Sequence, residues 1–362
     1  MSAASIAPML LGPHSLIDAP RQDCRHRREE EPPAQATSIR EVLACVDGSE
    51  FGSGVTPHAQ AVAQALGARL TLLRVLETEP TGTAPPDSLD WGIRQREARA
   101  HLDSLRAQLG ELDCGIRSEL VQGRAAEQIC SWAEQHAVDL TVLCSHGARG
   151  VTDWDLASTA RKLVDRTPGS LLLVPAPVAT GGRKEVRYQR IMVPLDGSPR
   201  AESVVPVAMR IAAFQKAEVL FVHVVPVPEI TRMGPLDAEG AELERCVVEH
   251  NRRVASAYLD RLRAHVSQAG SRVRVLVAAG GSVRSRLEHL VGEERVDLVV
   301  MSAHGYTGET DSPCGSITEH AVTHATIPLL IVRDRASHRM KRARTSSARR
   351  LEPLAPPGPA PL

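Results

Sequence analysis

Four blocks of sequence occur twice in the chain, in the same order, and this repetition constrains the fold more than any single motif. The matched pairs are "EVLACVDGSEFGSG" (41–54) with "RIMVPLDGSPRAES" (190–203), "ARLTLLRVLE" (68–77) with "AEVLFVHVVP" (217–226), "VDLTVLCSHG" (138–147) with "VDLVVMSAHG" (296–305), and "PGSLLLVP" (168–175) with "TIPLLIVR" (326–333). A fixed order of four matched blocks indicates that one structural unit was duplicated. We therefore expect two copies of one domain.

Each copy alternates short apolar runs with apolar residues at helical spacing, which predicts βαβ units around a parallel sheet. In the second copy the expected strands are 190–195, 218–225, 272–278, 297–302 and 328–332. The longest helix is expected between its second and third strands, and the first copy has an equivalent at roughly 90–109. In the long helix one apolar stripe is predicted from Leu243, Val247, Val254, Tyr258, Leu262 and Val266.

The domain boundaries follow from the limits of the repeats. We expect the first domain at 39–176 and the second at 188–333, joined by a linker at 177–187. The segments 1–38 and 334–362 show no periodicity, and we predict that both are disordered tails. The segment 334–362 is basic and ends in a Pro-rich stretch. A solvated tail is the expectation there, with binding to nucleic acid or an acidic partner as the alternative.

Composition excludes several classes of protein. The formal net charge is zero, so no global field attracts nucleic acid or a membrane. No apolar run reaches the ~20 residues of a membrane span. The seven cysteines form no Cys-x-x-Cys pair, so we expect free thiols in a reducing compartment and no zinc site. A cytoplasmic location without membrane contact is the resulting expectation.

Two turns of the second copy carry its candidate chemistry. Ligands of open α/β sheets bind beyond the carboxyl ends of strands, where the strand order reverses. If that order is 3-2-1-4-5, Asp196 after the first strand and Ser302-Ala303-His304-Gly305 after the fourth face one crevice. Gly305 and Gly308 would let the backbone approach a ligand closely. Gly315-Ser316 would open the next helix, where free N–H groups favour phosphate.

These residues resemble the pattern of the universal stress protein family: a small residue, two residues and Gly after the fourth strand, then nine residues and Gly-Ser. Here the pattern reads Ser302-x-x-Gly305, nine residues, Gly315-Ser316. The resemblance covers both repeats and implies tandem doubly wound, Rossmann-like five-stranded sheets of the adenine nucleotide alpha hydrolase-like type, with strand order 3-2-1-4-5. It also implies a cytoplasmic stress-response protein that binds ATP or AMP, commonly as a dimer, with no settled catalytic activity.

The same resemblance implies the site residues. In the second copy they are Asp196, Val224, Ser302, His304, Gly305, Gly315, Ser316 and Ile317. In the first copy they are Asp47, Val75, Gly147 and Ser158. No catalytic residue and no protein metal ligand is implied.

Both copies depart from the family pattern. In the first copy Ala157 replaces the glycine at the helix start, so we expect that site to be weaker or empty. In the second copy Glu309 and Asp311 add two carboxylates to the phosphate loop, which would repel phosphate unless a divalent cation such as Mg²⁺ relieves the repulsion.

Alternative interpretations remain open from the residues alone. Asp47 and Asp196 could serve only the turn, because Asp-Gly favours tight turns. His146 and His304 have no partner at catalytic spacing, so structural loop roles are expected. An ATP-hydrolysing or nucleotidylyl-transferring enzyme would need a Ser-Gly-Gly-x-Asp-Ser loop or a His-x-Gly-His pair, and the chain has neither. A scaffold whose nucleotide sites have decayed is the remaining alternative.

The fifth strand of each copy predicts how the copies assemble. "SLLLV" at 170–174 and "PLLIV" at 328–332 would be apolar edges in a 3-2-1-4-5 sheet, and such edges invite pairing. We expect the two copies to pair internally as a pseudo-two-fold dimer of domains. The chain would then be a compact monomer or a homodimer of such pairs.

Overall fold

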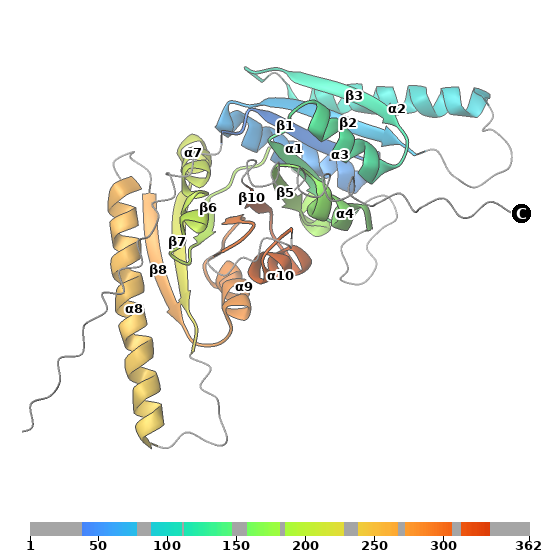
Figure 1. Cartoon of the computed structure of the whole chain (residues 1–362). Helices are drawn as coiled ribbons and strands as arrows, with labels where there is room; N and C mark the ends of the chain where they lie inside the picture. The colour runs from blue at the N-terminus through green and yellow to red at the C-terminus, as the bar shows by residue number, and fades with distance from the viewer. Residues whose placement is uncertain are drawn as a thin grey trace, which may run out of the picture. The chain divides into compact units, whose positions relative to one another are not determined.

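The computed structural model describes residues 38–77, 88–110, 112–146, 158–181, 185–227, 238–266, 272–305 and 313–333 (Figure 1). The predicted tails, 1–38 and 334–362, fall outside these ranges apart from Ser38. None of the described helices is both long and apolar enough to span a membrane.

Strands and helices alternate in both repeats, as the sequence predicts. The first repeat contains β1 (Glu41–Val46), α1 (Glu50–Leu66), β2 (Arg69–Leu76), α2 (Ser88–Leu109), β3 (Ile116–Gln122), α3 (Ala125–Gln135), β4 (Leu140–Cys144), α4 (Ser158–Arg166) and β5 (Ser170–Val174). The second repeat contains β6 (Arg190–Pro194), α6 (Pro199–Glu202), α7 (Val205–Gln215), β7 (Glu218–Val225), α8 (Ala238–Val266), β8 (Arg272–Ala279), α9 (Val283–Glu293), β9 (Leu298–Ser302), α10 (Ser316–His324) and β10 (Leu329–Val332).

All ten strands belong to one sheet, in the order β3-β2-β1-β4-β5-β10-β9-β6-β7-β8. Each half has the predicted order 3-2-1-4-5, and within each half the neighbouring strands run parallel. The halves are not separate sheets, because β5 and β10 pair antiparallel and join them. The predicted pairing of the two fifth strands is therefore present within the chain.

The register of the β5–β10 pair is symmetric. Leu172 lies opposite Leu330, and these two residues hold the same position in the two copies. A local two-fold relation therefore passes through this pair of strands. Both residues are fully buried, so the apolar edge expected of each fifth strand is covered by the other.

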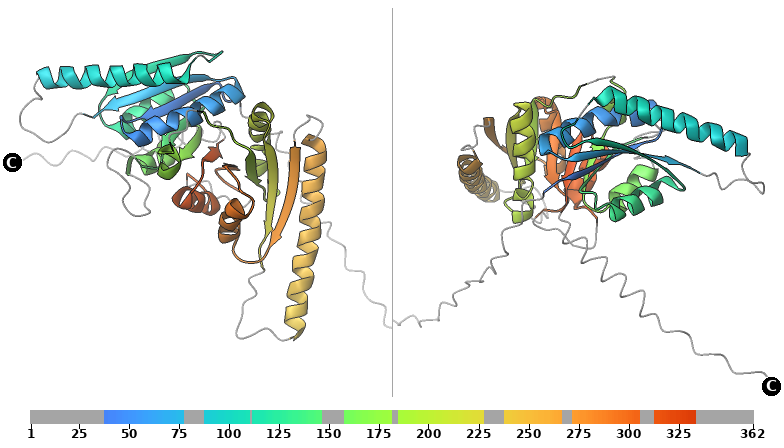
Figure 2. Two further views of the ribbon diagram at one scale, coloured as in Figure 1. Left: turned by 180° about the vertical axis from the view of Figure 1, so that it is seen from behind. Right: turned by 90° about the horizontal axis from the view of Figure 1, so that it is seen from above.

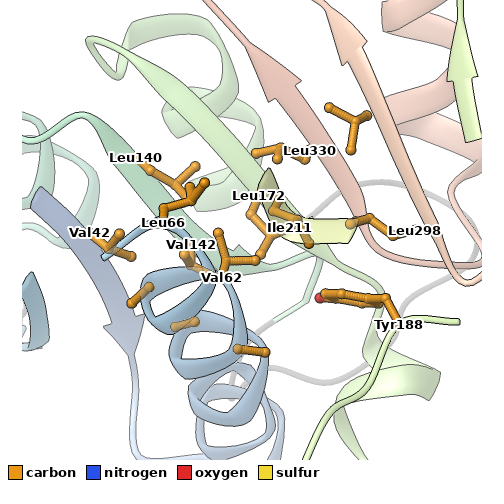
Figure 3. Packing of buried hydrophobic residues seen from close by; sticks show 14 of the residues in the cluster. Val42, Val62, Leu66, Leu140, Val142, Leu172, Tyr188, Ile211, Leu298 and Leu330 are labelled. Atoms are coloured by element: carbon orange, nitrogen blue, oxygen red, sulfur yellow. The ribbon is translucent and has the colours of Figure 1, made fainter. Parts of the chain in front are cut away.

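Buried side chains form two apolar clusters that each draw residues from both repeats. One includes residues of α1, α2, α7 and α8, and the other includes residues of α3, α4, α9 and α10. Figure 3 shows part of the first cluster, with Leu172 and Leu330 from the two fifth strands, Val62 from α1 and Ile211 from α7. The sheet is thus covered by helices on both faces, as parallel sheets require (Figure 2).

The predicted apolar stripe of α8 is only half correct. Tyr258, Leu262 and Val266 pack against the core, as expected. Leu243 and Val254 are 61% and 55% exposed, and Val247 is also exposed. Val254 adjoins buried Ala255, so its exposure reflects the face of the helix on which it lies. For Leu243 and Val247 the reason is the length of the helix. A helix of 29 residues is about 43 Å long, whereas the eight residues of β8 cover about 26 Å. The N-terminal part of α8 therefore extends past the end of β8 (Figures 1 and 2).

The segment after β5 contacts the first repeat at two places. It begins with a short helix, α5 (Ala176–Ala179), in which Ala176 and Ala179 are buried. Gly54 of α1 lies so close that a Cβ on it would collide with the Ala179 carbonyl. At the other end, buried Tyr188 forms a 2.9 Å hydrogen bond with Nδ1 of His58 in α1. Both ends of the connection are thus held against the first repeat.

Candidate functional site

The strand order reverses between β6 and β9, which are neighbours in the second half of the sheet. Asp196 follows the carboxyl end of β6, and Ser302 is the last residue of β9. Parallel neighbours end at the same edge of a sheet, so the two turns meet there. The two turns that the sequence places at the candidate site therefore lie at the same edge of the sheet, on either side of the reversal.

Asp196 lies directly against Gly305. Oδ1 of Asp196 accepts a 2.9 Å hydrogen bond from the Ser198 backbone N–H, as expected for a residue that stabilises the turn. Its other carboxylate oxygen occupies the place where a Cβ at Gly305 would stand. Gly305 has an ordinary backbone φ, so glycine is needed here for space. Asp196 thus serves the turn and also reaches the end of β9.

Hydrogen bonds tie the start of α10 to the end of β9. The N–H of Gly315 donates to the Ala303 carbonyl at 2.7 Å, and the hydroxyl of Thr318 donates to the Ser302 carbonyl at 3.0 Å. Gly315 is the N-cap of α10 and has no side chain to cap the helix. The start of this helix is therefore held against the end of β9, at the sheet edge where Asp196 lies.

The structure also describes four other residues that the sequence predicts for the second site. Val224 is buried in β7, the strand next to β6, and Ser316 is exposed at the first turn of α10. The hydroxyl of Ser302 donates 2.7 Å to the His304 carbonyl, so it supports the turn itself. The side chain of Ile317 packs into the apolar cluster between α9 and α10. Ile317 could therefore contribute to a ligand site only through its backbone.

The two repeats differ most clearly above the glycine of the Asp-Gly-Ser turn. Gly197 and Gly48 have the same backbone conformation, with φ of +82° and +84°. Apart from its two chain neighbours, no atom of the described residues would lie within 4 Å of a Cβ added to Gly197. A Cβ added to Gly48 would lie 2.7 Å from the Cζ atom of Arg74. A guanidinium therefore covers the turn of the first repeat, whereas no described side chain covers the equivalent turn of the second repeat.

This difference arises at one position in the second strand of each copy. Arg74 lies 27 residues after Asp47, and His223 lies 27 residues after Asp196. His223 turns toward the backbone, where its Nδ1–H donates to the Leu195 carbonyl at 2.8 Å. The imidazole is therefore anchored at the strand, whereas the longer Arg74 side chain reaches the turn.

Asp47 also has different surroundings from Asp196. Oδ1 of Asp47 accepts from the backbone N–H and the hydroxyl of Ser49, at 2.9 and 2.5 Å. It also fills the space that a Cβ at Gly52 would need, and the second copy has Ala201 at this position. In the first repeat, then, the aspartate leans toward the start of α1.

The remaining predicted residues of the first copy are less complete in the structure. Val75 lies in β2, partly buried against the apolar cluster of α3 and α4. Gly147 falls outside the described residues, and Ser158 is described only as the first residue of α4.

Sequence reasoning missed a polar cluster around the first turn. His101 of α2 forms a 3.2 Å hydrogen bond with the Ser53 hydroxyl. Burial and then the charge of Arg74 lower the pKa of His101, and the charge of Asp47 opposes them. Burial also lowers the pKa of Arg74, opposed by the carboxylates of Asp47 and Glu97. The only sequence signal was an arginine where the second copy has histidine.

In the second repeat the long helix α8 brings Tyr258, rather than a histidine, toward the turn. Burial, and then the Glu202 carboxylate, raise the pKa of the Tyr258 phenol, and Asp196 contributes in the same direction. A neutral phenol is thus the neighbour that α8 supplies, whereas α2 supplies an imidazole. Within the described residues no group of three or more His, Cys, Asp and Glu side chains could hold a metal ion.

A family model described as "Universal stress protein family" matches residues 38–175 and again residues 187–333. The chain belongs to the universal stress protein family. The double match assigns one family domain to each repeat, in agreement with the resemblance seen in the sequence.

Several relatives span one or both domains. A universal stress protein of Mycobacterium tuberculosis, Rv2005c, is 23% identical over 81% of this chain and 96% of its own length. A single-domain universal stress protein from Thermus aquaticus is 32% identical over 38% of this chain and 98% of its own length. A universal stress protein structure from Archaeoglobus fulgidus covers 81% of this chain and 96% of its own, at 15% identity and TM-score 0.54. The tandem arrangement therefore occurs in other proteins of the family.

Proposed function

We propose that the second domain binds an adenine nucleotide, ATP or AMP, and that the protein acts as a nucleotide-responsive regulator in a stress response. The observation that carries this proposal is that no described side chain covers Gly197, whereas Arg74 covers Gly48, and that the Asp196 carboxylate beside this turn reaches Gly305. The start of α10 at Gly315 is held to the end of β9, the strand next to β6, by its hydrogen bond to the Ala303 carbonyl. A polar group for a base and N–H groups for phosphate therefore stand at one crevice.

The roles of the residues follow from their chemistry. Asp196 is acceptor-only when ionised, so it suits a ribose hydroxyl or the amino group of a base. The backbone of Val224 in β7 would border the base. Gly305 and Gly315 would leave room for phosphate, and the backbone N–H groups of the first turn of α10, from Ser316 on, would donate to it, because the helix dipole favours an anion there.

The first domain is proposed not to bind nucleotide in this way. Arg74 covers the turn that the ligand would use, and Ala157 replaces the glycine at the helix start. The first domain instead supplies half of the sheet and part of both apolar clusters. The scaffold role that the sequence left as an alternative is therefore assigned to the first domain alone.

An Asp196→Asn variant separates ligand binding from the turn. The asparagine oxygen can still accept the Ser198 N–H, so the turn and the thermal stability should be preserved. The charge is lost, and the amide presents donors to the ligand. We expect the affinity for ATP and AMP, measured by titration calorimetry, to fall at least tenfold. Unchanged affinity together with unchanged stability would leave Asp196 with the turn role only.

A further inference from the structure

One ion pair joins the two helices whose N-termini stand at the predicted phosphate sites. Nη2 of Arg161 in α4 lies 2.7 Å from Oε1 of Glu319 in α10. Each residue comes three positions after the serine that begins its helix, Ser158 or Ser316. Arg161 and Glu319 are therefore equivalent positions of the two repeats that contact each other across the β5–β10 pairing.

This contact is complementary only because the repeats differ. Two identical domains related by the same two-fold would bring Arg against Arg or Glu against Glu. Here opposite charges meet, and the hydrogen bond to Glu319 raises the pKa of Arg161. Arg161 also lies 3.6 Å from Asp165 of its own helix. Because the two copies differ at this position, the tandem chain can form an ion pair that a pair of identical domains could not form.

Glu319 stands where its charge would affect an anion. It lies in the first turn of α10, and helical side chains tilt toward the N-terminus of their helix. The backbone N–H of Glu319 donates to the Gly315 carbonyl at 2.9 Å, so its charge lies within one helical turn of Gly315 and Ser316. It would repel a phosphate bound there, and the repulsion would grow with phosphate charge. A cation that pairs with Glu319 reduces this repulsion.

A second contact, made by Arg333, links the end of α4 to the residue that precedes Gly315. Arg333, at the end of β10, is only 6% exposed. Its guanidinium donates to the carbonyls of Val164 and Thr167 at the end of α4, the latter at 3.0 Å. It also lies 3.4 Å from the sulfur of Cys314, the residue before Gly315. The helix that carries Arg161 is therefore fixed relative to the start of α10.

We propose that Arg161 of the first domain is a positioning residue for the nucleotide site of the second domain, and that it favours ligands by their phosphate charge. It pairs with Glu319, and its positive charge offsets the negative charge of that carboxylate near the start of α10. This inference rests on the proposed function of the second domain. It makes the first domain part of the site, although that domain's own turn is covered.

The test compares ATP, AMP and adenosine binding to the full chain by titration calorimetry at low ionic strength. For Arg161→Ala we expect a loss of about three- to tenfold in ATP affinity, a smaller loss for AMP and none for adenosine. Glu319→Gln should restore ATP affinity to the Arg161→Ala chain, and Arg161→Lys should retain most of it. Arg124→Ala, which removes another exposed pair in the first domain, is the matched control.

The outcomes separate this inference from the proposed function. An unaltered chain that binds none of the three ligands overturns both. If the unaltered chain binds ATP but Arg161→Ala leaves all affinities unchanged, or lowers ATP and adenosine affinity equally, only the role of Arg161 is wrong. A loss that persists in the Glu319→Gln background also overturns it. Unfolding temperatures of the variants, measured in parallel, show whether any loss is one of stability.

Discussion

The carboxylate of Asp196 fills the position that a side chain at Gly305 would need. This relation joins the ends of β6 and β9 across the point where strand order reverses. Because the backbone of Gly305 suits any residue, Gly305→Ala should fold but displace the carboxylate. We expect ATP, AMP and adenosine affinities to fall together by about tenfold or more, with little change in unfolding temperature.

Gly292→Ala serves as the control for that variant. Gly292 is in α9, where an added Cβ meets open space, so binding should be unchanged. If Gly305→Ala binds nucleotide as tightly as the unaltered chain, Asp196 is not placed as described.

Arg74 provides a reciprocal test of the difference between the domains. Arg74→His introduces the residue that the second copy has at this position and should clear the space above Gly48. Combined with Ala157→Gly, it should create a second site, seen as a rise in stoichiometry from one nucleotide per chain toward two. Conversely, His223→Arg should place a guanidinium above Gly197 and weaken the second-domain site at least tenfold.

The double variant and the His223→Arg variant can each contradict the proposed difference between the domains. A stoichiometry that stays at one in the double variant would show that Arg74 is not what closes the first domain. Full binding by His223→Arg would show that the space above Gly197 is not used.

Magnesium dependence tests the two carboxylates of the phosphate loop. Glu309 and Asp311 lie outside the described residues, so the expectation comes from the sequence. Their charges should repel a triphosphate more than a monophosphate, and a divalent cation should offset this repulsion. We expect a chelator to weaken ATP binding about tenfold and AMP binding much less. Glu309→Gln with Asp311→Asn should reduce the dependence, and equal ATP affinity with and without magnesium would exclude it.

Ile331 tests the joint between the domains. It is fully buried in β10 and lies opposite Leu171 in β5. Ile331→Lys would bury an unpaired charge, which should lower the free energy of unfolding by more than about 4 kcal/mol or separate the domains. Ile331→Val should cost only about 1 kcal/mol. Small-angle scattering should show one compact particle for the unaltered chain, and two independent lobes would refute the joint.

Much of the fold was predictable because the repeats report it twice. The strand expected at 218–225 has those bounds, and the strand expected at 272–278 extends by one residue. β7 is buried along most of its length and is largely an apolar run, so its limits are visible in the sequence. The edge strand β8 is only partly buried, and its start shows as alternating Arg and Val. The exposed start of α8 was not predictable, because the apolar spacing at Leu243 and Val247 does not reveal where the neighbouring strand ends.

The site was predictable only in part. Asp196, Gly305 and Gly315 could be found because a turn, a close approach and a helix start each leave a local sequence signal. The position of Arg74 over Gly48 depends on a side-chain conformation, which no sequence spacing records. The pairing of Arg161 with Glu319 depends on how β5 meets β10, and becomes visible only once that register is known.

The central claim is that one adenine nucleotide binds per chain, at the start of α10 in the second domain. It is tested most directly by titrating the full chain, Gly315→Val and Ala157→Val with ATP. A Cβ at Gly315 would meet only ordinary contacts from the protein, so Gly315→Val should fold, but its bulk stands where phosphate approaches. We predict one site in the unaltered chain, lost in Gly315→Val and retained in Ala157→Val. Equal or greater loss in Ala157→Val would contradict the account.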